Sequence, residues 1–255
     1  MEKALPIVEV CNLTIGYGEN IVLKDLSFAI DRGGICTILG GSGCGKSTLL
    51  KHLIGLYRPF SGDIMIQGRS IVTATPKEKD LMMRGFGVTY QSGALFGSLT
   101  LLENVMLPLE EFTAMTRPQR IAAAREKLAM VELDGFDNYY PAELSGGMRK
   151  RAGLARALAL EPELLFFDEP SAGLDPLTSA DLDRLILHLK DKLGATFIIV
   201  THELDSIFAI ADRCLILDKR TKGVVADGDP RELREKSANP WVKSFLNRNN
   251  LRYCN

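Results

Sequence analysis

The segment GGSGCGKST, residues 40–48, constrains the fold more strongly than any other part of the chain. It matches the pattern G-x-x-x-x-G-K-[ST], follows the apolar run ICTIL and opens the helix-like stretch KSTLLKHLIG. Glycines let backbone N–H groups converge on phosphate oxygens, and the start of a helix adds its positive dipole end. The sequence therefore predicts a strand, a phosphate-binding loop and a helix. The residues expected to bind the nucleotide are Gly40, Gly41, Ser42, Gly43, Cys44, Gly45, Lys46, Ser47 and Thr48.

The sequence predicts specific roles for three side chains of this phosphate loop (residues 40–48), those of Lys46, Ser47 and Cys44. Lys46 supplies a positive charge at the β- and γ-phosphates, and the hydroxyl of Ser47 is a ligand for Mg²⁺. Cys44 would become reactive if the surrounding N–H dipoles lowered its pKa. The alternative is that Cys44 is simply a small residue that fits the loop.

Two acids end the apolar run LLFFDEP. A carboxylate at the C-terminal end of a parallel strand lies at the crevice where ligands bind. Asp168 is expected to hold Mg²⁺, directly or through water. Glu169 is expected to act as general base toward the attacking water, a function that typically contributes about 10²–10⁴ in rate. Alone, two such acids would indicate a solvated strand end, but the phosphate loop favours a catalytic pair.

A second anion site is predicted at LSGGMRKR, where Ser145, Gly146 and Gly147 precede the helical run MRKRAGLARALAL. Free N–H groups, a hydroxyl and a helix dipole meet there. One ATP already has its phosphates surrounded by residues 40–48. A second phosphate-binding helix end is therefore expected to close over ATP bound to another copy of the chain.

With these motifs the chain resembles an ATP-binding cassette (ABC) ATPase over residues 6–235, and the motifs occur in the order of that family. The resemblance implies that the LSGG segment of one subunit caps the γ-phosphate held by the other, so that two ATP molecules are sandwiched in a homodimer. The residues expected to act across the dimer are Leu144, Ser145, Gly146, Gly147 and Asp175.

Further positions match the family individually. Tyr17 resembles the aromatic residue that stacks on adenine, although an ordinary loop tyrosine is the alternative. Gln91 resembles the glutamine that reaches Mg²⁺ and the attacking water, and His202 resembles the switch histidine that contacts the γ-phosphate. Asp175 resembles the aspartate that links the two nucleotide sites. The resemblance thus implies a catalytic set of Glu169, His202 and Gln91, and metal ligands Ser47, Gln91 and Asp168.

The order of elements predicts an α/β fold. Strand-like runs alternate with helices, which argues for a parallel sheet, while DLSFAI alternates as a half-exposed antiparallel strand does. The resemblance adds a P-loop NTPase core of the RecA-like type. We expect this core, with an antiparallel β-subdomain, to occupy residues 6–91 and 163–236. A helical subdomain is expected at 92–162 and a tail at 237–255.

Composition limits the classes of function. The net charge is −1, so no overall electrostatic attraction to nucleic acid is expected. No apolar run approaches the ~20 residues that span a membrane, and the start MEKALPIVEV lacks the apolar core of a signal peptide, so we expect a cytosolic protein.

The basic run Arg149, Lys150 and Arg151 is interpreted as a solvated helix face. Without a CxxC pair, reduced thiols are expected at Cys11, Cys36, Cys44, Cys214 and Cys254.

ATP hydrolysis in this family drives transport or, in soluble members, DNA repair, translation or iron–sulfur assembly. The chain has neither a long insertion nor a second cassette, which favours transport. The segments YQSGALFGSLTLLENVMLPLEE, the signature region and NPWVKSFLN resemble the ATPase of Mla-type, MCE-linked phospholipid transporters. That resemblance implies an inner-membrane permease, a periplasmic MCE-domain partner, a possible STAS-domain regulator and a place on the cytoplasmic face of the bacterial inner membrane. The alternatives are a small-molecule importer or exporter ATPase and an iron–sulfur assembly ATPase.

Two apolar segments are expected to meet partners. Leu95 and Phe96 lie where the sheet gives way to the helical insertion, and in the ABC family this hinge frames the groove for the permease's coupling helix. Burial in their own subdomain is the alternative. The tail residues Trp241, Phe245 and Leu246 are too apolar to stay free, and docking on the chain's own core or on another subunit is left open.

Overall fold

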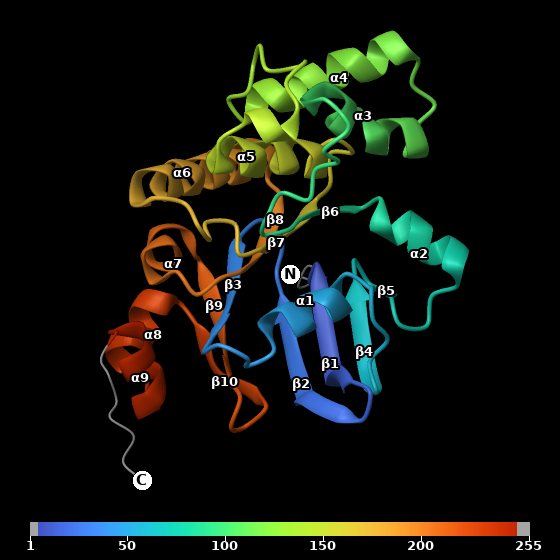
Figure 1. Ribbon diagram of the computed structural model, residues 1–255. Coiled ribbons are helices and arrows are strands. Elements are labelled where there is room, and N and C mark those ends of the chain that lie inside the picture. Colours follow the sequence, from blue (N-terminus) through green and yellow to red (C-terminus); the bar gives the residue numbers. More distant parts are fainter. Residues whose placement is uncertain (1–4, 249–255) are drawn as a thin grey trace.

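The fold is built around a six-stranded sheet in the order β10-β9-β3-β8-β7-β6 (Figure 1). The strands from β9 to β6 are parallel, and β10 pairs antiparallel at the edge. The computed structural model describes residues 5–248. The strands of this sheet are β3 (Ile35–Gly40), β6 (Phe86–Thr89), β7 (Leu164–Asp168), β8 (Thr196–Val200), β9 (Arg213–Asp218) and β10 (Gly223–Gly228).

The apolar runs of the sequence form the central strands. Every residue of β3 and of β8 is buried, as expected for parallel strands covered on both faces. Side chains of β7 alternate between two cores: Phe166 packs into one cluster, and Phe167 packs into the other. The sheet therefore separates two hydrophobic cores, and its C-terminal edge is free to carry polar groups.

The first core lies between this sheet and a four-stranded antiparallel sheet in the order β2-β1-β4-β5. Helix α1 (Lys46–Leu53) contacts strands of both sheets and buries Leu49, Leu50 and Leu53 (Figure 1). The phosphate loop thus lies between two packed layers. The strands are β1 (Val8–Tyr17), β2 (Asn20–Ile30), β4 (Ser61–Ile66) and β5 (Arg69–Ser70).

The second core lies on the other face of the six-stranded sheet, under a block of helices at the top of Figure 1. Helix α3 begins with a capping box, in which Thr100 and Glu103 satisfy each other's backbone N–H groups. Such a cap typically stabilises a helix by about 1 kcal/mol. The elements are α3 (Leu101–Phe112), α4 (Arg117–Met130), the 3₁₀ turn η1 (Pro141–Glu143), α5 (Gly146–Ala157) and α6 (Pro176–Leu193).

Helix α2 (Pro76–Met83) was not expected from the sequence. It is short and mostly polar, so apolar periodicity does not reveal it. Its start nevertheless has a recognisable pattern, because Thr75 and Glu78 form a capping box and Pro76 begins the helix. The capping residues could therefore have located this helix.

The remaining helices follow the last parallel strands. They are α7 (Leu204–Ile210), α8 (Pro230–Lys236) and α9 (Pro240–Leu246). Together with one face of β9 they enclose a third cluster that contains Leu39 and Ile216. None of the helices within residues 5–248 is both long enough and apolar enough to cross a membrane.

Candidate nucleotide-binding site

The polar motif residues gather at the C-terminal edge of the six-stranded sheet. β3 ends at the phosphate loop, β7 ends at Asp168, and β8 is followed by Thr201 and His202. These strands are neighbours in the order β3-β8-β7 and run parallel, so their C-terminal ends meet at one edge. β6 pairs with β7 and delivers Gln91 to the same edge.

The phosphate loop lines a cleft of about 750 Å³. Gly40 has φ 146°, and a Cβ there would lie 2.5 Å from the carbonyl oxygen of Leu217, so only glycine fits. The ammonium of Lys46 donates a hydrogen bond to the carbonyl of Gly40 at 3.0 Å. The side chain of Lys46 therefore ties the end of the loop back to the backbone at its start. The cleft is lined by residues 40–48 together with Val22, Gln91, Glu169, His202 and Phe245.

Asp168 is half-buried beside the loop, and the hydroxyl of Ser47 donates to its Oδ1 at 3.2 Å. Burial raises the pKa of the Asp168 carboxyl, the hydrogen bond from Ser47 opposes this rise, and the charge of Glu169 adds to it. The side chains of Ser47 and Asp168 present adjacent oxygen atoms, and oxygen is the ligand type that Mg²⁺ prefers. This donor set fits a magnesium ion.

Glu169 and His202 form a pair at the mouth of the cleft. Nδ1 of His202 lies 2.9 Å from both carboxylate oxygens of Glu169. Glu169 adopts a left-handed backbone with φ 51°, and its N–H donates to the carbonyl of Val200 at 2.8 Å. Such backbone geometry in a residue other than glycine costs of order 1–3 kcal/mol and is common at functional sites. The geometry turns the carboxylate toward the cleft, where a general base would be placed.

The signature segment, Leu144 to Gly147, lies at the start of α5. Ser145 is the N-cap of α5, and its Oγ accepts a hydrogen bond from the N–H of Met148 at 3.2 Å. A Cβ added to Gly147 would lie 2.6 Å from Cγ2 of Thr178 in α6. The N-termini of α5 and α6 are therefore in close contact.

Asp175 caps α6 and accepts hydrogen bonds from the N–H groups of Leu177 and Thr178, each at 3.1 Å. The hydroxyl of Thr178 also donates to Asp175, and this bond, followed by those from the backbone N–H groups, lowers the pKa of Asp175. Within the part of the chain that the structure describes, Leu144, Ser145 and Asp175 line neither the phosphate-loop cleft nor its neighbour. Gly146 lines the neighbouring cleft of about 580 Å³, together with Gln91 and Asp168.

Tyr17 lies at the end of β1 and is 42% exposed. Its ring contacts Tyr57 edge-on, with the ring centroids 5.5 Å apart. Tyr17 is not among the residues that line the phosphate-loop cleft of the described chain. Its role in adenine stacking stays a prediction.

The comparisons with known proteins agree with this geometry. The family model described as "ABC transporter" matches residues 23–172. The chain belongs to the ABC transporter family. The solved "Dimeric Structure of MJ0796, a Bacterial ABC Transporter Cassette" superposes with a TM-score of 0.79 at 33% identity and covers 87% of this chain and 98% of that one. Another structure of MJ0796 is described as a post-hydrolysis state bound to ADP and Pi. The predicted family, fold class and ATPase class are confirmed.

Three relatives differ in their described cargo. A Mycobacterium tuberculosis protein, "Probable ribonucleotide transport ATP-binding protein mkl", is 42% identical over 94% of this chain, which spans 66% of its length. The Escherichia coli "Intermembrane phospholipid transport system ATP-binding protein MlaF" is 36% identical over 96% of this chain and 91% of its own length. A Rhizobium meliloti "Fe(3+) ions import ATP-binding protein FbpC 1" is 37% identical over 95% of this chain and 67% of its length.

In the loop between β6 and α3 of this ABC cassette, the structure differs from the expectation that Leu95 and Phe96 are both available to a partner. Phe96 is 57% exposed, but Leu95 is half-buried and packs against the second core, so the two do not form an exposed pair. Fully buried Asn104 fixes the loop. Its Oδ1 accepts from the N–H of Phe96 at 2.8 Å, and its Nδ2 donates to the carbonyls of Phe96, Leu99 and Thr100.

The basic run of α5 is not a solvated face. Arg149 donates to the carbonyl of Leu144, and Arg151 pairs with Glu132. Lys150 donates to the carbonyl of Ala172, and burial lowers its pKa. The sequence interpretation was wrong because it treated the helix as isolated, whereas these side chains connect α5 to neighbouring segments.

Cys44 is buried, and this burial raises the pKa of its thiol, with the charge of Lys46 opposing the rise. The hypothesis that N–H dipoles lower its pKa is therefore wrong, because desolvation of the thiolate outweighs them. The interpretation as a small residue that fits the loop agrees with the structure. Cys254 lies outside the described residues.

The C-terminal helix α9 docks on the cassette itself. Val242 and Leu246 are buried in the third cluster. Trp241 and Phe245 are half-buried and stack on each other with centroids 5.3 Å apart. Phe245 also lines the phosphate-loop cleft, a contact that the sequence analysis missed because it joins segments about two hundred residues apart. The part of the tail from residue 249 on lies outside the described residues.

Proposed function

We propose that this chain hydrolyses ATP at the phosphate-loop cleft and thereby powers a membrane transporter. The observation that carries the proposal is the Glu169–His202 pair at the mouth of that cleft. Backbone N–H groups of the loop and Lys46 bind the phosphates. Glu169 accepts the proton of the attacking water while His202 orients the carboxylate.

Ser47 and Asp168 are the residues that would hold Mg²⁺ through their side-chain oxygens. Gln91 lines the same neighbouring cleft as Asp168 and would be a third ligand. When bound, the ion neutralises charge on the β- and γ-phosphates. Asp168 then positions Ser47 through their hydrogen bond, so the helix start and the strand end act on the same ligand.

A homodimer completes the site in this proposal. Among the described residues, Ser145 and Gly147 do not line the phosphate-loop cleft of their own chain. A second copy can place the N-terminus of its α5 over the bound γ-phosphate, where the helix dipole and the N–H groups bind the anion. The dimeric MJ0796 cassette supports such an arrangement.

We infer phospholipid as the cargo of the transporter. The supporting observation is that the MlaF match extends over nearly the full length of both chains, whereas the mkl and FbpC matches leave about a third of those relatives uncovered. The partners would then be an inner-membrane permease, a periplasmic MCE-domain protein and a STAS-domain regulator, with the chain on the cytoplasmic membrane face. Phe96, which is exposed, is the residue proposed to contact the permease. Leu95, which packs against the second core, anchors the loop that carries it.

The second candidate is a small-molecule importer, which the FbpC relative favours. Purification of the tagged chain from its native membrane separates the two. Co-purification of a permease with an MCE-domain protein and bound phospholipid is expected. A periplasmic solute-binding protein in place of the MCE-domain protein would overturn the lipid assignment and leave the ATPase proposal intact.

A further inference from the structure

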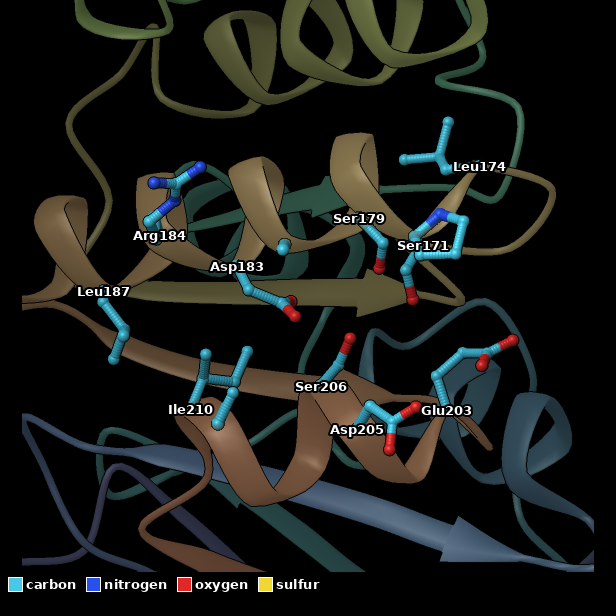
Figure 2. Close-up of a pocket in the computed structure, with 13 residues that line it drawn as sticks. Ser171, Leu174, Ser179, Asp183, Arg184, Leu187, Glu203, Asp205, Ser206 and Ile210 are labelled. Atoms are coloured by element: carbon cyan, nitrogen blue, oxygen red, sulfur yellow. The ribbon is translucent and has the colours of Figure 1, made fainter.

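A separate pocket of about 410 Å³ lies between α6 and α7. Its lining includes Ser171, Ser179, Asp183 and Ser206, and Figure 2 shows the oxygens of these four side chains pointing toward the space between the helices. Among the described residues, none lines both this pocket and the phosphate-loop cleft. The pocket therefore lies outside the site proposed above.

Asp183 is a buried carboxylate that forms no ion pair with a cation in the described part of the chain. It is 8% exposed and hydrogen-bonds with Ser206, and burial raises the pKa of its carboxyl against the effect of that bond. None of the ion pairs found within residues 5–248 includes Asp183. The neighbouring Arg184 also lines the pocket, but its exposed guanidinium pairs with Asp181. A buried carboxylate is costly unless a cation or several hydrogen-bond donors compensate it.

Ser171 supplies a second and independent observation. It is 4% exposed, and its Oγ has no hydrogen-bond partner among residues 5–248. Buried hydroxyl groups are nearly always hydrogen-bonded, so an orphaned one at the wall of a cavity is available to bond with a molecule that enters it. In Figure 2 this hydroxyl points into the same space as the carboxylate of Asp183.

The surroundings define the class of ligand. At the rim, Asp205 pairs with Arg248 at 2.9 Å, and Glu203 lies 3.6 Å from the imidazole of His202, so both of these acids already have a nitrogen-bearing neighbour. Asp183 is the buried carboxylate among the residues that line the pocket, and its other buried polar neighbours there are the hydroxyls of Ser171 and Ser206. Leu187 and Ile210 form an apolar end of the pocket.

We propose that this pocket binds an organic cation, a primary ammonium or guanidinium group on an aliphatic stem. The cationic head donates hydrogen bonds to Asp183 and to Ser171, and the stem packs against Leu187 and Ile210. The head can belong to a free amine or to a Lys or Arg side chain of a partner protein. Ser171 lies in the segment between Glu169 and Asp175, so the ligand would contact the chain next to the proposed catalytic base.

The test is calorimetric titration of the full-length chain, without nucleotide, with agmatine and with N-acetyl-arginine amide. One saturable site is expected, and 1-butanol, which has an aliphatic stem but no charge, should not compete. Tighter binding of agmatine indicates a free amine, and tighter binding of the arginine derivative indicates a protein side chain. Absence of saturable binding by both compounds overturns the proposal, but leaves the ATPase proposal untouched because no nucleotide is present.

Two variants and a matched control make the test specific. Asp183→Asn keeps the shape of the side chain and should weaken binding at least about tenfold, which corresponds to 1.4 kcal/mol. Ser171→Ala should weaken it less, and Asp181→Asn, on the same helix but paired with Arg184, should leave it unchanged. A melting curve confirms that each variant folds. Equal affinity of the wild type and a folded Asp183→Asn would show that binding occurs elsewhere and would overturn the proposal.

Discussion

The phosphate-loop cleft and the signature segment are proposed to hold the same phosphate group from opposite sides, yet they are built differently. Residues of the cleft are placed by the ends of parallel strands whose register is fixed through buried cores. The signature segment is placed by the N-termini of α5 and α6, which meet at Gly147 and Thr178. The position of the cleft residues thus depends on the packing of two large cores, whereas that of the signature segment depends on local contacts, among them the close approach of Gly147 to Thr178.

The largest effect is expected for the cleft. Glu169→Gln removes the proposed base but keeps the shape of the side chain, so hydrolysis should fall by about 10²–10⁴ while ATP still binds. The variant should accumulate as an ATP-bound dimer. Phosphate release and sedimentation velocity measure these outcomes. The control is Glu163→Gln, an exposed acid just before β7. A Glu169→Gln chain that stays monomeric at saturating ATP, even with its permease, contradicts the dimer mechanism.

An intermediate effect is expected for the signature segment. Gly147→Ala places a methyl group against Cγ2 of Thr178, and such overpacking costs about 1–3 kcal/mol, so ATP-driven dimerisation should weaken roughly tenfold. Adding Thr178→Ser removes Cγ2 but retains the hydroxyl that donates to Asp175, and should restore dimerisation. Dimerisation is measured by sedimentation at several ATP concentrations. If the double variant is no better than Gly147→Ala, the contact does not position the segment.

The smallest effect on ATP chemistry is expected outside both regions. Phe96→Asp changes an exposed ring and should leave ATP binding by the isolated subunit unchanged, but it should reduce coupled transport several-fold if a permease helix packs there. Reconstituted transport and nucleotide affinity are measured together. Phe112→Asp, at another partly exposed ring, is the control. Wild-type transport by the Phe96→Asp complex removes this loop from the coupling proposal.

The sequence predicted those parts of the molecule that depend on local patterns. The buried strands β3, β7 and β8 follow from continuous apolar runs, and the turn at residues 40–48 follows from its glycines. Which side chains meet across the sheet depends on register and on long-range packing. For that reason the contact of Phe245 with the cleft was missed, as was the attachment of Lys150 to Ala172.

The proposed roles of the site residues also depend partly on local sequence and partly on long-range packing. A motif can place Glu169 after a strand, but its left-handed backbone and its contact with His202 require the neighbouring strand β8. The sequence left open whether Leu95 is exposed or buried in its own subdomain, and the packing of the helical block leaves it half-buried against the second core. Local sequence therefore identifies the candidates, while tertiary contacts decide their orientation.

The buried amide of Asn104 has a mechanical consequence. Because it bonds to both backbone groups of Phe96 and also to the carbonyls of Leu99 and Thr100, the loop and the first turn of α3 form one stiff unit. In the proposed coupling, a force on the ring of Phe96 would therefore be passed to α3 rather than absorbed by bending of the loop. Because α3 and α5 share the second core, the same force would reach the signature segment at the start of α5.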